Sequence, residues 1–203
     1  MSRRLTAAAL ALAAIALSGC ISLFPKADPA QLYRFEARPP SQMFPPGPLF
    51  GVLRLGSAFP RASSGDRILT VNDSGEAAYI AGARWVSPAA DLYMESIENA
   101  FAAQATRVRL IGPRELTRGQ RSLDIAIRSF EARYDAPGLA PTIVVTARAR
   151  LLVLPERTVS AERVFTVEQP ATANRVSAIV EAFDLATRDI NTQIVAWTDA
   201  SAG

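Results

Sequence analysis

The sequence predicts an α/β fold, with a mixed, largely antiparallel sheet and two main helices packed on one face. Three observations lead to this prediction. Apolar residues alternate with polar ones along 123–134 and 145–167, which is the period of two that strands require. Between 176 and 197 apolar residues instead recur every three or four positions, as on one face of a helix. A similar spacing over 93–101 predicts the second helix.

Short extended segments dominate the first half of the chain. The alternation predicts strands at 31–37, 51–55, 67–71 and 77–85. Gly82 interrupts the last of them. The proline-rich stretch 39–48 lacks too many backbone donors to be a helix or a central strand, so it predicts a surface loop. Its apolar Met43 and Phe44 leave open a contact with a partner.

Ser87 and Pro88 mark the start of the first main helix. Serine is a favoured N-cap, and proline is a favoured first helical residue. The apolar side chains that follow at helical spacing are Tyr93, Ile97, Ala100 and Phe101. Glu95, Glu98 and Asn99 fall elsewhere, so one face is expected to pack and the other to remain in water.

A change of phase occurs within the segment 123–134. Its apolar residues occupy odd positions up to Ile127 and even positions from Phe130 onward. One extra residue must absorb this slip, which predicts a β-bulge near Arg128 and Ser129. A turn at 135–138 would then place Ile127 opposite Val145 and Asp124 opposite Arg148.

The register of the next hairpin follows from matching apolar residues across it. A three-residue loop, 155–157, places Val153 opposite Val159 and Leu151 opposite Ala161. The reverse face then carries charged residues that we expect to be solvated and joined by weak ion pairs. These are Asp124, Arg148, Arg150 and Glu162.

The last element is predicted as a helix of about 25 residues that starts after Pro170. Its apolar stripe consists of Val176, Ile179, Phe183, Ala186, Ile190, Ile194 and Trp197. The length of this stripe matches that of the apolar face formed by the antiparallel strands predicted within 123–167. We therefore expect the helix to cover that face rather than to form a coiled coil with a partner.

The N-terminal segment has the layout of an export signal. Arg3 and Arg4 precede an uncharged run from Leu5 to Leu17, which is shorter than the roughly 20 apolar residues of a membrane-spanning helix. The run ends in Leu17, Ser18, Gly19 and Cys20. This ending resembles the lipobox of bacterial lipoproteins, in which the cysteine receives a diacylglycerol, the leader is cut before it, and the new amino group is acylated.

This resemblance implies that the chain is divided into three parts. Residues 1–19 would be a lipoprotein signal peptide, 20–30 a lipidated tether and 31–203 a single domain. Each buried methylene contributes about 0.8 kcal/mol, so several acyl chains on Cys20 would anchor the domain firmly. Ile21 stands where an aspartate usually retains lipoproteins in the inner membrane of enteric-like bacteria, which favours the periplasmic face of the outer membrane.

Composition argues against several functions. Without Arg3 and Arg4, 20 basic residues face 19 acidic ones, so nothing points to nucleic acid. The chain has no histidine, and Cys20 is its only cysteine. This removes Ser-His and Cys-His catalysis and most zinc sites. No glycine-rich phosphate motif is present. We expect no enzyme, no catalytic residues, no metal and no cofactor beyond the covalent lipid.

Several segments together resemble the ABC-type transport auxiliary lipoproteins of Gram-negative bacteria, which accompany complexes containing MCE proteins, including Pqi-type systems. The resembling segments are the lipobox at Cys20, 32–35, 51–55, Tyr79, 84–88 and the helix end 194–197. The resemblance covers nearly the whole mature chain. It implies partners among MCE-type and ABC transporter components and a part in phospholipid traffic between membranes. It implies no catalytic residues.

The expected function is therefore that of a lipid-anchored auxiliary component that attaches a lipid-transport complex to the outer membrane. Assembly of the chain into a homo-oligomer is left open. Two alternatives stay open. The domain could itself carry an acyl chain in an apolar groove, which the segment with Met43 and Phe44 could line. It could instead be an envelope scaffold for cell-wall or lipopolysaccharide machinery. Trp85 is interpreted as a core residue, and Arg84 as solvated.

Overall fold

A computed structural model describes residues 29–35, 49–112, 115 and 119–201. Among these residues, one mixed sheet of eight strands carries helices on one side, which confirms the predicted fold class. The strands are β1 Gln31–Tyr33, β2 Phe50–Arg54, β3 Arg67–Asn72, β4 Ala77–Trp85, β5 Val108–Ile111, β6 Arg121–Tyr134, β7 Thr142–Val153 and β8 Thr158–Pro170. The helices are α2 Arg61–Ser64, α3 Ala89–Gln104 and α4 Val176–Ser201.

Strand β6 is the branching point of the sheet because it pairs with three strands, β2, β3 and β7. One edge pairs with antiparallel β7, which in turn pairs with antiparallel β8. The other edge pairs in parallel with β2 near the start of β6 and with β3 near its end. The long pairings are therefore antiparallel, as expected. The parallel pairings are short: β1 with β4, β2 with β5, β2 with β6, and β3 with β6.

The predicted bulge in β6 is confirmed, because the register between β6 and β7 shifts between Ile127 and Ser129. The expected partners are two residues off: Ile127 lies opposite Ala147, and Asp124 lies opposite Arg150 rather than Arg148. The connection to β7 spans 135–141, which is longer than the predicted four-residue turn. A shift of two preserves the alternation, so the face assigned to each side chain is still correct.

The register of the β7–β8 hairpin is confirmed along most of its length, including Leu151 opposite Ala161. Near the turn it changes, and Val153 pairs with Thr158 instead of Val159. The hydroxyl of Ser160 donates a hydrogen bond to the Leu151 carbonyl at 3.2 Å, at the place where the shift occurs. Ser160 is the extra residue of β8 at this shift, so the predicted apolar matching fails close to the turn.

Helix α3 begins one residue later than the sequence suggested. The Pro88 carbonyl accepts the amides of Asp91 and Leu92, so Pro88 is itself the N-cap and provides no side-chain hydrogen bond. The prediction that Ser87 caps this helix is therefore wrong. The backbone amide of Ala89 instead donates to the Gly65 carbonyl at 2.9 Å, which ties the helix start to the segment after α2. Strand β5 and the short α2 were not predicted.

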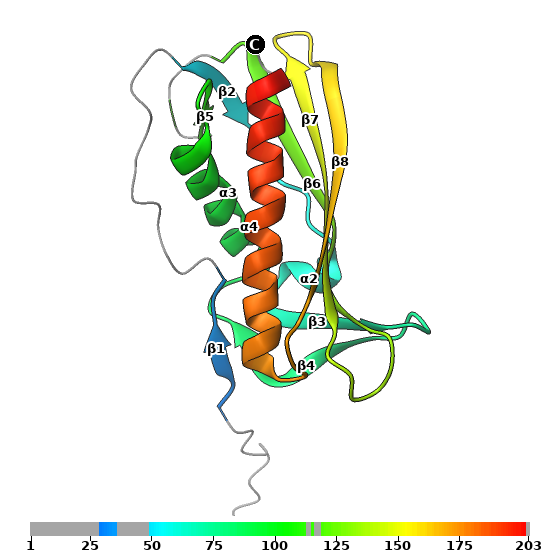
Figure 1. Ribbon diagram of the computed structural model, residues 1–203. Helices are drawn as coiled ribbons and strands as arrows, with labels where there is room; N and C mark the ends of the chain where they lie inside the picture. The colour runs from blue at the N-terminus through cyan, green and yellow to red at the C-terminus, as the bar shows by residue number, and fades with distance from the viewer. Residues whose placement is uncertain (1–28, 36–48, 113–114, 116–118, 202–203) are drawn as a thin grey trace, which may run out of the picture.

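Helix α4 lies along the long strands, as its stripe predicted (Figure 1). Its inward residues join one core together with α3 and the apolar face of the sheet. Phe183 and Ile190 have no exposed surface, and Trp197 packs edge-on against Phe165 at 5.9 Å. Trp85 is only 2% exposed, which confirms it as a core residue.

The end of α4 is attached to the loop before β5 by one carboxylate. Asp199 accepts hydrogen bonds from the backbone amides of Thr106, Arg107 and Val108, at 2.7, 3.2 and 3.1 Å. It also accepts the Thr106 hydroxyl at 2.9 Å. A single side chain thus satisfies four donors between segments that are far apart in sequence.

Replacing Asp199 with alanine should lower the free energy of unfolding by about 2 kcal/mol, because hydrogen bonds to a charged group are stronger than neutral ones. Urea denaturation measures this loss. Asp189→Ala is the matched control, since Asp189 is exposed and, among the described residues, bonds only to Gln193 in the next turn. That variant should stay within about 0.5 kcal/mol of the parent. Equal losses in the two variants would contradict the proposed role of Asp199.

Candidate functional site

A pocket of about 250 Å³ lies where α3 crosses β2 and β5. Its apolar lining includes Phe101 of α3 and Val108 and Leu110 of β5. Its polar lining includes Arg54 and Glu98. The short strand β2 contributes Arg54 because Val52 and Arg54 alternate onto the same face, which α3 covers.

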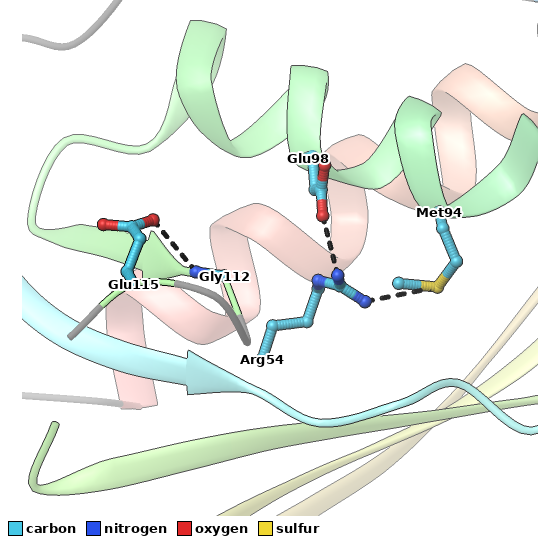
Figure 2. Close-up of polar contacts among 5 residues, drawn as sticks. All are labelled: Arg54, Met94, Glu98, Gly112 and Glu115. Carbon is cyan, nitrogen blue, oxygen red and sulfur yellow. Dashed lines mark hydrogen bonds and ion pairs between the residues drawn. The ribbon is translucent and has the colours of Figure 1, made fainter. Parts of the chain in front are cut away.

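Arg54 is the most enclosed charge in this pocket, with its side chain only 14% exposed. Its Nη2 lies 2.9 Å from Oε1 of Glu98, and its Nη1 lies 3.8 Å from the sulfur of Met94 (Figure 2). The Nε of Arg54 is buried and has no hydrogen-bond partner among the described residues. An arginine this enclosed requires a carboxylate partner, and Glu98 provides it from the helix above.

Glu115 closes the rim of the same pocket. Its Oε1 accepts the backbone amide of Gly112 at 3.0 Å, just after β5 ends (Figure 2). Its other oxygen accepts the guanidinium of Arg109. Among the described residues, the lining therefore carries two arginines and two glutamates. Such a lining offers both charges and apolar surface to a ligand.

In the ranges that the structure describes, two ionisable groups have clearly shifted pKa values. The hydrogen bond from Arg150 to Asp124 raises the pKa of Arg150, and the charge of Asp124 adds to this effect. Partial burial raises the pKa of Tyr134. Both shifts favour the protonated form, so neither creates a group that titrates near neutral pH. Within the described ranges, no three potential ligands cluster as a metal site would require.

The comparison with known protein families decides the identity of the domain. Residues 57–195 match the model of the family described as the ABC-type transport auxiliary lipoprotein component. This chain belongs to that family. The family description names a lipoprotein and a transport component, not a class of enzymes. Membership in a lipoprotein family implies attachment to a membrane of the cell envelope.

Solved structures share the fold of this family member. The crystal structure of a protein from Xanthomonas campestris is 26% identical, has a TM-score of 0.70, and is matched over 85% of this chain and 96% of its own. An uncharacterized protein with 14% identity has a TM-score of 0.64 over 83% and 98% of the two chains. A hypothetical protein from Chlamydia trachomatis, with 12% identity, has a TM-score of 0.54 over 76% and 98%. The last two show the fold alone. No curated protein matches the chain.

The predicted lipobox of this family member, Leu17, Ser18, Gly19 and Cys20, lies outside the described residues, as does the proline-rich segment 39–48. The division into 1–19, 20–30 and 31–203 therefore stays a prediction. None of the helices in the described ranges has the length and apolar character needed to cross a membrane. Arg84 is about half exposed and pairs with Asp66 at 2.8 Å, in line with its expected solvation.

The auxiliary-lipoprotein sequence gave little indication of the Arg54 pocket. Glu98 was expected to face water, and Arg54 was not singled out. A signal did exist, since Arg54 follows Val52 by two residues and so falls on the apolar side of its strand. Which element covers that side depends on the crossing of α3 over β2, and no local pattern predicts it.

The two partners of this ion pair should respond differently to substitution. Glu98→Gln leaves the enclosed Arg54 guanidinium without a charge partner and should lower the free energy of unfolding by about 1 kcal/mol, allowing for screening at the half-exposed Glu98. Arg54→Met should cost less, because methionine fills the space and water can solvate Glu98. Urea denaturation of both variants checks the order, and a larger loss for Arg54→Met would reverse the interpretation.

Proposed function

We propose that this family member is a periplasm-facing outer-membrane lipoprotein which attaches an ABC/MCE-type phospholipid transport system, including the Pqi type, to that membrane. The match of residues 57–195 to the auxiliary-component family carries the proposal, because it associates the domain with ABC-type transport. The lipobox at Cys20 provides the anchor, and Ile21 favours the outer membrane. The work assigned to the domain is association, performed by a folded body tethered to the bilayer.

The packing of the domain favours attachment over carriage of lipid. Helices α3 and α4 close the apolar face of the sheet into one continuous core. The pocket beside Arg54, at about 250 Å³, falls below the roughly 300–1,000 Å³ of typical small-ligand sites, and hollows of about 390 and 420 Å³ elsewhere on the domain lie near the lower end of that range. A phospholipid is larger than such ligands. Within the described residues, the Arg54 pocket does not accommodate a whole phospholipid.

Crosslinking in native membranes tests the proposal. The acylated protein is purified after mild crosslinking, and the proteins recovered with it are identified. MCE-type and ABC transporter components should be present, and they should be depleted when a Cys20→Ser chain is used as the control. Recovery of neither class, from membranes that contain both, would refute the proposed association.

The alternative function, a lipid carrier, has one observation in its favour: the apolar lining of the Arg54 pocket by Phe101, Val108 and Leu110. A carrier should copurify with about one phospholipid per chain, detected by mass spectrometry after extraction. The attachment role predicts no such stoichiometric lipid beyond the covalent anchor.

A further inference from the structure

A second hollow, of about 390 Å³, opens on the sheet beside the bulge in β6. Its walls are Ala58, Phe59, Pro60, Ala126, Ile127, Arg128 and Arg148. Ala126 alternates with the core residues Ile125 and Ile127, so it belongs to the sheet face turned away from α3 and α4. This hollow is therefore separate from the Arg54 pocket.

The bulge places Arg128 at this hollow. Ile127 pairs with Ala147 and Ser129 pairs with Thr146, so Arg128 is the extra, unpaired residue of β6. Arg148 reaches the hollow from the neighbouring strand β7, where it lies opposite Ala126. Two arginines from adjacent strands thus line one hollow.

Neither arginine has a carboxylate partner among the described residues, and the walls of the hollow contain no acidic side chain. The Nε of Arg148 is buried and has no hydrogen-bond acceptor in the described part of the chain. Arg150, two residues along the same strand and on the same face, is instead satisfied by Asp124. Two arginines at one hollow, one of them with a buried donor that has no partner among the described residues, favour an oxyanion, which would accept hydrogen bonds from both.

We propose that this hollow, formed by Arg128 and Arg148, binds the phosphate group of a small molecule or a lipid headgroup. Guanidinium groups bind phosphate oxygens through paired, charge-assisted hydrogen bonds. The volume leaves room for a substituent next to the phosphate, and Phe59 and Pro60 offer apolar surface for its carbon atoms. The proposal does not depend on the transport role.

Isothermal titration of the full chain, in an uncharged detergent and a phosphate-free buffer, tests the site. The probes are inorganic phosphate and glycerophosphoglycerol, the deacylated headgroup of phosphatidylglycerol. The variants are Arg128→Gln and Arg148→Gln, and Arg175→Gln is the control because Arg175 is exposed and absent from the walls of the hollow. Each wall variant should raise the Kd about tenfold or more, while the control should bind like the parent.

Arg128 is exposed, so its variant should fold even if Arg148→Gln does not, and circular dichroism verifies the fold of each. Tighter binding of glycerophosphoglycerol than of phosphate identifies a headgroup site, and the reverse order identifies a free-phosphate site. Absence of binding by the parent, or equal binding by parent and Arg128→Gln, would overturn the proposal. So would tighter binding of a short polyglutamate peptide than of either probe, since that result assigns the hollow to an acidic polypeptide.

Discussion

Replacing Phe130 with alanine should lower the free energy of unfolding by about 3–5 kcal/mol, the largest stability effect expected in this domain. Phe130 is 2% exposed and lies at the centre of an aromatic cluster. Its ring centroid is 4.9 Å from that of Phe183, 5.4 Å from Phe59, 5.5 Å from Phe35 and 6.4 Å from Trp85. Alanine would leave a cavity among rings contributed by α4, β4 and the segments around β1 and α2, and these cannot all collapse into it.

Urea denaturation of Phe130→Ala, followed by circular dichroism, measures this loss. Phe130→Leu should retain much of the stability because leucine fills more of the space. Leu185→Ala is the control, since Leu185 is 45% exposed on α4 and alanine favours helix; its stability should change by about 0.5 kcal/mol or less. A loss below about 1.5 kcal/mol for Phe130→Ala would show that the cluster does not organise the core.

The second large effect concerns the anchor. Cys20→Ser should abolish incorporation of radiolabelled palmitate, because a hydroxyl cannot replace the thiol that receives the diacylglycerol. The precursor should also retain its leader, which is visible as lower mobility in gel electrophoresis. Ser18→Ala is the matched control: it keeps a small residue in the lipobox and should leave labelling unchanged. Absence of palmitate from the parent chain, or a mature N-terminus at another residue, would remove the basis for the anchor.

Loss of the acyl chains should also release the domain from the membrane almost completely. Each buried methylene contributes about 0.8 kcal/mol, and two or more acyl chains hold a protein far more firmly than one. Removal of the predicted leader with Arg3 and Arg4 would leave 20 basic and 19 acidic residues, a near-neutral balance that offers no electrostatic substitute for this attachment. The covalent lipid would therefore determine whether the domain stays at the membrane.

Much of the fold followed from periodicity alone. Alternation identified the faces of β6, β7 and β8, and the change of phase located the bulge at Arg128. The three-or-four spacing defined α4 and the side chains that it buries. These features depend on neighbours within a few residues, and a strand or helix imposes its repeat on any sequence that forms it.

Only the tertiary structure decided what depends on loop lengths and distant contacts. The parallel pairing of β2 and β3 with β6, and the two-residue offset between β6 and β7, leave the apolar pattern unchanged, so periodicity could not distinguish them. The same holds for both polar sites. Arg54 meets Glu98 because α3 crosses β2, and Arg128 and Arg148 line one hollow because the register sets Arg148 opposite Ala126, beside the bulge. The sequence determined which side chains share a face and predicted the acyl anchor; long-range packing determined which charges meet.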